Sequence, residues 1–374
     1  MTLFQNGLFG CLKKLTIIIL IVAIAIPLRY GSTSPSYLAV RLIHSMFSLK
    51  NSLIPDKTRP TLSADYRAFE DLIRMKPLTK IDTSVDPLVI IKELRLTMGQ
   101  TNISPKPAEC QIRKEIFKYN AHTTDGYWVS NQLKSSSKNS DKILIYIHGG
   151  GFMTGDINTY SGFECYLSHI FNINVLHVEY RLVPEHPYPA AVDDTIALYH
   201  ALLDRNISPS RMMIMGDSAG GGLALQTMQV LITRELPVPH GVILLSPWAD
   251  ISSSGESYTR NRPIDPILFD HNSTWVAAQI LGPKQIHLSH KDPLISPLYG
   301  SFKGFPPMYV NVGTAEITED DSREIVKRAK QANVDVTLEV AVHLMHVYPI
   351  FYLYYPEARN TIDNINEWMK TKFD

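Results

Sequence analysis

The chain of 374 residues carries 36 basic and 36 acidic side chains, so its formal net charge is zero. Nucleic-acid binding needs a clustered positive surface, and no nucleic-acid partner is therefore expected. Hydrophobic residues make up 45% of the chain and charged residues 19%, which excludes a disordered protein and allows a large buried core. Three cysteines are too few for a disulfide scaffold.

Leu15–Leu28 is an uncharged apolar segment, preceded by Lys13 and Lys14 and followed by Arg29. Its fourteen residues are fewer than the roughly 20 that span a bilayer, and they fit the apolar region of a signal peptide. We expect residues 1–30 to be a signal anchor that attaches the chain to the membrane, with a cleaved signal or peripheral attachment as alternatives. The expected location is the endoplasmic reticulum, with a single pass and the folded domain in the lumen.

Two further features bear on this location. Asn102, Asn206 and Asn272 begin N-x-S/T triplets, which predict a glycoprotein, although proline follows two of the three. Cys110 and Cys165 could form a disulfide in an oxidising lumen, or remain two buried thiols.

The pattern of apolar residues changes at about Gln111. Before it, helix-period apolar faces at Tyr37–Phe47 and Ala64–Met75 stand among prolines. After it, short apolar runs alternate with helical stretches, which is typical of a doubly wound, mostly parallel α/β sheet covered on both faces. The predicted strands are Ile143–Ile147, Val175–Val178, Met212–Met215, Val242–Leu245, Met308–Val312 and the alternating Val334–Val340. The predicted helices are Tyr160–Ile170, Ala190–Leu203, Ser218–Thr233 and Ser322–Gln331.

Gly216–Gly220 matches the pattern G-x-S-x-G between a predicted strand and a Gly/Ala-rich helix. A sharp strand-to-helix turn would expose the hydroxyl of Ser218 at a helix N-terminus and make it a nucleophile. The alternative is a tight turn in which the serine only caps the helix. Asp217 is expected to be a structural hydrogen-bond acceptor and not a proton carrier.

The second glycine-rich motif, HGGGF at His148–Phe152, directly follows a predicted strand. It does not fit the G-x-G-x-x-G loop of dinucleotide-binding proteins. Backbone N–H groups without neighbouring side chains can instead bind an oxyanion. The candidate oxyanion-hole residues are Gly149, Gly150, Gly151 and Ala219. His148, Phe152 and Trp248 are candidates for lining a substrate pocket.

In proteins with a G-x-S-x-G turn of this kind, the catalytic acid and then the histidine base follow the serine along the chain. Glu316 lies on the loop that leaves the strand Met308–Val312 and is the preferred acid, with Asp320 second. Thr318 and Asp321 form a T-x-x-D capping box, which would place Glu319, Asp320 and Asp321 on the surface as a first helical turn. For the base, spacing leaves both His343 and His346 open.

Together these motifs resemble the hormone-sensitive lipase-like branch of the α/β-hydrolases, the GDXG lipase family. The match extends over Ile143–Tyr352 and includes HGGGF, YRLVPEHP at Tyr180–Pro187, GDSAGGG at Gly216–Gly222, and SPWAD at Ser246–Asp250. In the family the acid lies about thirty residues before the histidine, which favours Glu316 with His346. The resemblance also implies a helical cap from residues 31–110 and part of an insertion at about 252–290, over a catalytic domain of residues 111–374.

The predicted protein is a serine carboxylic-ester hydrolase that uses Ser218, His346 and Glu316. Similarity to membrane-anchored arylacetamide and steryl-acetate deacetylases implies short-acyl esters of hydrophobic alcohols as substrates. The alternatives are an amide hydrolase with the same triad and a non-catalytic ligand-binding protein on this fold. No metal or organic cofactor is expected, and the oligomeric state stays open. The YRLVPEHP segment is expected to be structural, with Glu185 and His186 bracing the sheet.

Overall fold

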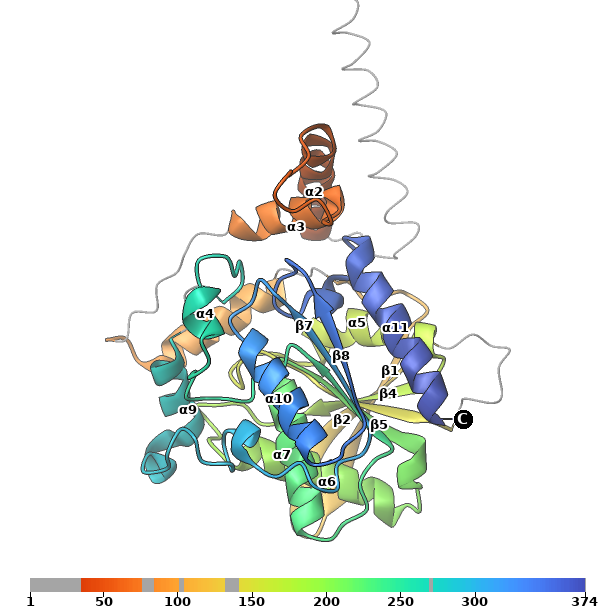
Figure 1. Cartoon of the computed structure of the whole chain (residues 1–374). Helices are drawn as coiled ribbons and strands as arrows, with labels where there is room; N and C mark the ends of the chain where they lie inside the picture. The colour runs from red at the N-terminus through yellow and green to blue at the C-terminus, as the bar shows by residue number, and fades with distance from the viewer. Residues whose placement is uncertain (1–34, 76–83, 101–103, 132–140, 269–271, 374) are drawn as a thin grey trace, which may run out of the picture.

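In this computed structural model the described residues are 35–75, 84–100, 104–131, 141–268 and 272–373. An eight-stranded sheet forms the centre of the molecule, in the order β1-β2-β4-β3-β5-β6-β7-β8 (Figure 1). β2 runs antiparallel to β1 and β4, and all other neighbouring strands are parallel. The strands are β1 (Gln111–Tyr119), β2 (His122–Ser130), β3 (Ile143–Ile147), β4 (Asn174–Glu179), β5 (Met212–Asp217), β6 (Gly241–Leu245), β7 (Met308–Gly313) and β8 (Val336–Ala341).

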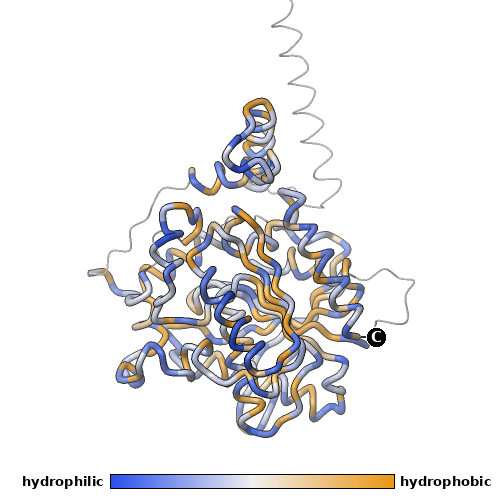
Figure 2. The backbone as a smooth tube through the Cα atoms, viewed as in Figure 1, coloured by the Kyte–Doolittle hydropathy of each residue, from blue (hydrophilic) through white to orange (hydrophobic). Residues whose placement is uncertain are grey.

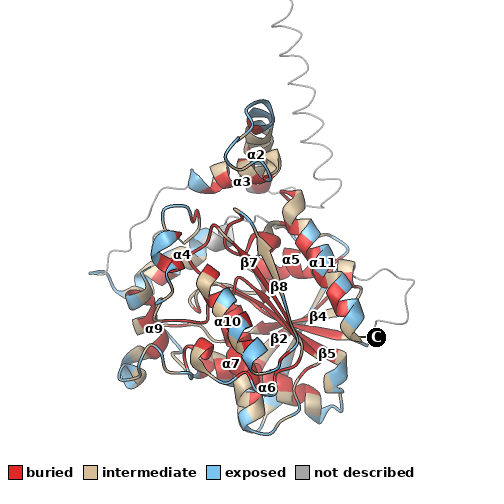
Figure 3. Cartoon of the chain, in the orientation of Figure 1, coloured by how far each residue is buried: buried red, intermediate tan, exposed pale blue. Residues whose placement is uncertain are grey.

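Helices cover both faces of the sheet, as the continuous apolar strands predict. The residues of β3 alternate between two separate cores, with Ile143, Ile145 and Ile147 in one and Leu144 and Tyr146 in the other. The first core lies under α6 (Ala190–Asp204), α7 (Ala219–Thr233) and α10 (Glu319–Gln331). The second lies under α5 (Ile157–Phe171) and α11 (Pro356–Phe373). Figure 3 shows the buried strands between these two layers. The predicted doubly wound α/β fold is confirmed.

Two strands, β1 and β2, lie outside the sequence prediction. Their residues are mostly half-buried or exposed, and only Phe117 is buried in β1. Polar side chains therefore interrupt the apolar runs that identify the central strands, because one face of this edge hairpin meets solvent. The strands predicted inside the sheet all exist, with ends shifted by no more than two residues.

The N-terminal part of the described chain is helical. It contains α2 (Pro35–Leu53), α3 (Ala64–Arg74) and α4 (Pro87–Gln100). α2 and α3 form a hairpin that stands on the rest of the molecule beside the N-terminal end of α11 (Figure 1). Its contact with the body is partly aromatic, since Phe69 packs against Phe351 and Tyr354 with ring centroids 4.7 and 4.6 Å apart. Hydrogen bonds add to it, among them those from Ser63 to the carboxylate of Glu357. α8 (Ser257–Arg260) and α9 (Ser273–Gln285) form the insertion between β6 and β7. Whether these parts act as a cap stays a prediction.

The described helices include none that combines the length and the apolar character needed to cross a membrane. The predicted anchor, residues 1–30, and the triplet asparagine Asn102 lie outside the described residues. Asn272 is exposed and caps α9, because its side-chain oxygen accepts from the N–H of Trp275.

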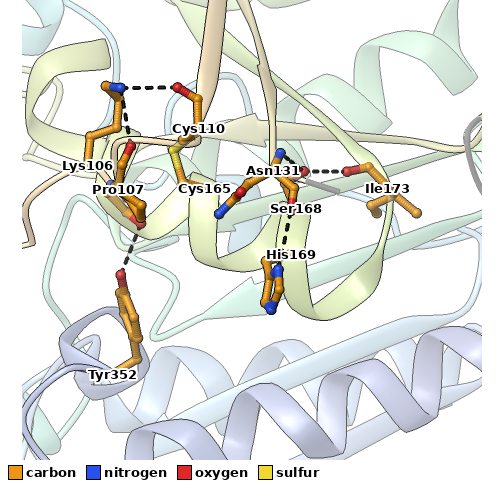
Figure 4. The surroundings of a disulfide bond; sticks show 10 residues. Lys106, Pro107, Cys110, Asn131, Cys165, Ser168, His169, Ile173 and Tyr352 are labelled. Atoms are coloured by element: carbon orange, nitrogen blue, oxygen red, sulfur yellow. Dashed lines mark hydrogen bonds between the residues drawn. A yellow bond between two sulfur atoms is a disulfide. The ribbon is translucent and has the colours of Figure 1, made fainter. Parts of the chain in front are cut away.

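Cys110 and Cys165 form a disulfide, which decides between the two alternatives left by the sequence (Figure 4). Cys110 lies directly before β1 and Cys165 lies in α5, and both are buried. The ammonium group of Lys106 donates to the carbonyl oxygen of Cys110, at 3.1 Å. The bond thus fastens the end of the N-terminal helical segment to the helix that covers the sheet.

Replacing both cysteines in the variant Cys110→Ala/Cys165→Ala should lower the free energy of unfolding by about 2–4 kcal/mol, because an open chain gains entropy when it unfolds. Urea titration followed by tryptophan fluorescence measures this change. Cys11→Ser is the control and should leave the midpoint unchanged. Equal midpoints for the double variant and the parent chain would contradict a stabilising role for this disulfide.

Candidate active site

Ser218 occupies the turn between β5 and α7 with a backbone conformation that non-glycine residues rarely adopt, at φ 52° and ψ −122°. Small neighbours make this turn possible. A Cβ atom on Gly220 would lie 2.1 Å from the carbonyl oxygen of Ile147, and one on Gly216 would lie 2.4 Å from the carbonyl oxygen of Gly220. Backbone hydrogen bonds fix the serine itself, since its N–H donates to Leu245 and its carbonyl accepts from Trp248. The strained turn predicted for the nucleophile is present.

His346 connects this serine to the acid. Its Nε2 lies 2.9 Å from the Oγ of Ser218, and its Nδ1 lies 2.5 Å from Oε2 of Glu316. The three side chains come from three loops at the carboxyl ends of β5, β7 and β8. His343, the alternative base, lies elsewhere: its backbone N–H and C=O contact Thr314 and Tyr66.

Glu316 is fully buried and its carboxylate accepts hydrogen bonds on both oxygens. Oε1 accepts from the N–H of Gly313 at 2.6 Å and from the hydroxyl of Ser246 at 2.9 Å. Oε2 accepts from the hydroxyl of Thr318 at 2.9 Å, beside the contact with His346. A buried carboxylate with this many donors is held in one orientation. Asp320, the second candidate acid, instead accepts from Arg260 and from the N–H of Ser257.

Burial alone lowers the pKa of His346, but the hydrogen bond and the charge of Glu316 outweigh it, so the pKa is raised overall. The carboxylates of Asp265 and Asp217 act in the same direction. An imidazole with a raised pKa is a stronger base toward a hydroxyl proton, and its protonated form is stabilised where it develops.

The predicted capping box at Thr318 and Asp321 is wrong. Thr318 precedes α10 but its side chain makes no capping hydrogen bond, because its hydroxyl donates to Glu316. Asp321 is buried, where its Oδ2 accepts from the N–H groups of Ala249 and Asp250. Burial raises the pKa of Asp321 to about 8. This first helical turn therefore joins the helix to the SPWAD loop and does not lie on the surface.

Asp217 is a structural acceptor, as predicted. Its Oδ1 accepts from the hydroxyl of Tyr146 at 2.7 Å and from the N–H of Gly149 at 3.0 Å, and its Oδ2 accepts from Tyr160 at 3.3 Å. Gly149 was one of the four predicted oxyanion donors. That prediction is corrected, because its single N–H is engaged by this carboxylate.

The directions of the N–H groups of Gly150 and Gly151 follow from the hydrogen bonds of the carbonyl oxygens that precede them. The carbonyl oxygen of Gly149 accepts from Nδ1 of His148, and that of Gly150 accepts from the N–H groups of Met153 and Thr154. In a trans peptide the next N–H points away from the carbonyl, so both N–H groups face away from these internal bonds. Ala219, the first residue of α7, has an N–H without an intrahelical acceptor.

The predicted pocket residue His148 is corrected to a structural role. Its imidazole is completely buried and stacks on Tyr180, with ring centroids 4.2 Å apart, while its Nδ1 donates to Gly149. Burial, followed by the charge of nearby His177, lowers the pKa of His148 to about 3, so the ring is neutral. Phe152 and Trp248 have ring centroids 6.3 Å apart and are almost buried. Their contact with substrate stays a prediction.

Sequence reasoning missed several residues that hold these loops. Arg95 of α4 donates to the carbonyl oxygens of Met153, directly after the glycine loop, and of Val183, within the YRLVPEHP segment. It also pairs with Glu185, at 2.6 Å, so this glutamate is linked through Arg95 to the end of the glycine loop. Whether Glu185 and His186 brace the sheet there stays a prediction. Ser246 donates to Glu316 and accepts from the N–H of Val347, directly after the histidine. Single polar residues on distant elements carry no local signal of such contacts.

The insertion between β6 and β7 reaches the acid loop as well. The side-chain amide of Asn261 donates to the carbonyl oxygen of Glu316, at 2.8 Å. Asp265 accepts from the N–H of Ile317, at 2.9 Å. The described residues contain no cluster of three or more metal-binding side chains.

A family model for the alpha/beta hydrolase fold matches residues 144–350, which is more than half of the chain. The chain belongs to the α/β-hydrolase family. An acetyl-hydrolase of Streptomyces hygroscopicus is 32% identical over 235 residues, covering 63% of this chain and 77% of the relative. An esterase of Acinetobacter venetianus is 34% identical over 230 residues, covering 61% and 74%.

Solved structures give the same result over more of the chain. The structure of EstE5 has a TM-score of 0.74 at 30% identity and covers 83% of this chain and 99% of its own. An esterase from the bacterial hormone-sensitive lipase family has a TM-score of 0.73 at 31% identity and covers 84% and 99%. The resemblance to this branch is confirmed, and the α/β-hydrolase is a carboxylesterase-like serine hydrolase.

Ser246→Ala should reduce kcat about 10-fold, because it leaves the buried carboxylate of Glu316 and the N–H of Val347 each without one partner. Steady-state kinetics on a soluble ester measures the loss. Ser322→Ala is the matched control: this serine is also completely buried, and within the described chain its hydroxyl has no hydrogen-bond partner. A similar kcat for both variants would rule out the positioning role of Ser246.

Proposed function

We propose that this α/β-hydrolase cleaves carboxylic esters with Ser218 as nucleophile, His346 as general base and then acid, and Glu316 as the residue that orients the imidazole. The observation that carries the proposal is the continuous row of hydrogen bonds from the Oγ of Ser218 through both nitrogens of His346 to Glu316. This arrangement is the one that nucleophilic acyl transfer requires.

The reaction follows from these contacts. As the Oγ of Ser218 attacks the ester carbonyl, its proton passes to Nε2 of His346, and the charge of Glu316 stabilises the imidazolium. The carbonyl oxygen becomes an oxyanion, which accepts from the N–H groups of Gly150, Gly151 and Ala219. Collapse breaks the ester bond, and His346 returns the proton to the departing alcohol. Water then attacks the acyl-enzyme by the same route and releases the acid.

Short acyl esters of hydrophobic alcohols are the proposed substrates. The relative from Streptomyces hygroscopicus is named an acetyl-hydrolase, which supports a small acyl group. Phe152 and Trp248 supply apolar surface beside the nucleophile, whose carbonyl accepts from the N–H of Trp248. The alternatives are an amide hydrolase using the same triad, and a non-catalytic binding protein, which would not need all three triad residues in hydrogen-bond contact.

The proposed location is the lumenal side of the endoplasmic reticulum membrane, with residues 1–30 as anchor. The disulfide between Cys110 and Cys165 supports an oxidising compartment. A gel shift after glycosidase treatment of protein expressed in animal cells would place the triplet asparagines in the lumen. The absence of any shift, together with free thiols at both cysteines in cells, would contradict this location.

The purified protein should release acetate from aryl or steryl acetates, and Ser218→Ala should lower kcat about 10⁴- to 10⁶-fold, because the nucleophile is lost. Acetate release measures activity, and a fluorophosphonate adduct located by mass spectrometry should lie on Ser218. Matched ester and anilide substrates distinguish an esterase from an amidase. Retained hydrolysis by Ser218→Ala would refute the mechanism, and activity on long triacylglycerols alone would refute the substrate class.

The pH dependence tests the base. Because catalysis needs neutral His346 and its pKa is raised above the usual 6.5, kcat/KM should be low in acid and rise through a pKa above 6.5. Glu316→Gln removes the main cause of the raised pKa, so the rise should move to lower pH while kcat falls by about 10⁴-fold. Glu316→Asp keeps the charge and is the control. An unchanged midpoint in Glu316→Gln would show that Glu316 does not act on His346.

A further inference from the structure

Apolar residues of α2 lie on both sides of the helix, including the side that faces away from the protein. Tyr37, His44 and Asn51 are buried and recur every seven residues, which defines the inner face. At 100° per residue, the opposite face carries a stripe of five apolar residues. These are Ala39, Leu42, Met46, Leu49 and Leu53. We call these five residues the α2 stripe.

Polar contacts hold the inner face of this helix. His44 contacts the carbonyl oxygen of Asp65 at 3.0 Å, Asn51 donates to Asp71 at 3.2 Å, and Ser48 donates to Asp65. An ordinary surface helix buries its apolar face and exposes its polar one. In α2 the inner face combines polar side chains with the apolar Tyr37 and Val40 and already packs on the protein. The outer face carries a second set of apolar side chains, so the helix has two faces that each need a partner.

The outward face is strongly exposed. Met46 is 61%, Leu49 53% and Leu53 75% exposed, and Ile54, just after the helix, is 66% exposed. These four lie within nine residues of chain, while the other nine exposed large hydrophobic side chains of the described residues are spread from position 75 to 342. Figures 2 and 3 show hydrophobic and exposed segments together at the outer end of the α2–α3 hairpin. Such a cluster marks an interaction surface.

We infer that the α2 stripe lies on the surface of a lipid bilayer. Pro35 follows Arg29, the residue that closes the apolar segment Leu15–Leu28, by six positions. Six residues reach at most about 20 Å, so a helix that begins there stays close to whatever holds that segment. Pro35–Leu53 contains no acidic residue that anionic headgroups would repel. Its two cations have partners within the protein, since Arg41 donates to the carbonyl oxygen of Leu353 and Lys50 pairs with Asp71.

The contact adds a second point of attachment to the proposed anchor. An anchor alone leaves the domain free to turn, whereas a helix lying in the interface holds the α2–α3 hairpin against the lipid. The hairpin in turn contacts the insertion between β6 and β7, since Arg74 of α3 donates to the carbonyl oxygen of Ile264. The next residue, Asp265, accepts from the backbone N–H of Ile317, directly after Glu316. The α2 stripe thus fixes how the active-site side of the molecule faces the bilayer.

A fluorescent label measures this contact in the full chain. Because Cys110 and Cys165 are joined, the variant Cys11→Ser/Met46→Cys has a single free thiol for an environment-sensitive nitrobenzoxadiazole dye. In vesicles of phosphatidylcholine and phosphatidylserine, its emission should shift to the blue and be quenched by brominated lipids. The matched control is Ile116→Cys in the same background, an equally apolar residue, 54% exposed, on the edge strand β1. Its label should remain water-like and unquenched.

Charges on the stripe provide the second variant. Leu49→Asp/Leu53→Asp should abolish the blue shift and the quenching at position 46, whereas Ile116→Asp should not. The turnover of a water-soluble ester should be unchanged in both, which shows that the fold and the active site are intact. If the double variant loses this turnover, its fold is disturbed. The labelled Met46→Cys variant, which introduces no charge, then tests the contact with lipid by itself.

The possible outcomes separate the anchor from the stripe. If the protein floats with vesicles in a density gradient but the label at position 46 stays unquenched, the anchor is supported and the contact of the α2 stripe with lipid is refuted. Protein that does not float would overturn both, and leave the proposed esterase activity standing. A blue shift that brominated lipids do not quench, and that disappears on dilution with a halving of mass, would identify a second copy of the chain as the partner and overturn the inference.

Discussion

The buried carboxylate of Asp217 holds together the two turns on which the active site depends. Asp217 is the last residue of β5, directly before the proposed nucleophile Ser218, and its carboxylate accepts from the N–H of Gly149 in the loop after β3. Burial raises the pKa of Asp217 to about 6, because the charged carboxylate is less stable away from water. Hydrogen bonds from the hydroxyls of Tyr146 and Tyr160 act in the opposite direction. Because one side chain bridges both loops, the strained serine and the glycine N–H groups keep a fixed relation to each other.

On the side of Glu316, a single polar side chain also connects two loops, and here it is the side chain of Ser246. Ser246 contacts Glu316 with its hydroxyl and the residue after His346 with its oxygen, so acid and base are tied to the end of β6. The loop of Glu316 follows the buried strand β7, and the loop of His346 follows β8, the edge strand beside it. The sheet supplies rigidity, and short polar contacts between the loops fix the distance between Ser218 and His346 that the proposed proton transfer requires.

The sequence predicts the parts of this molecule whose signals are local. The central strands are continuous apolar runs, and the turn at Ser218 requires glycines at fixed offsets, so both are recognisable without a structure. Contacts between distant residues are different. Nothing near Thr318 shows that its hydroxyl bonds the carboxylate two residues earlier instead of capping α10, and nothing near Gly149 shows that its N–H is already used. The edge strand β1 escapes prediction because solvent permits polar residues there.

The elements outside the sheet reach the site from two directions. Arg95 of α4 holds the glycine loop through the carbonyl oxygen of Met153, while Asn261 and Asp265 of the insertion hold the backbone of the acid loop. A segment whose side chains donate to or accept from loop backbone cannot shift without moving that loop. The N-terminal helices and the insertion are therefore part of the framework of the active site, and any force that orients them also acts on the relation between oxyanion donors and acid.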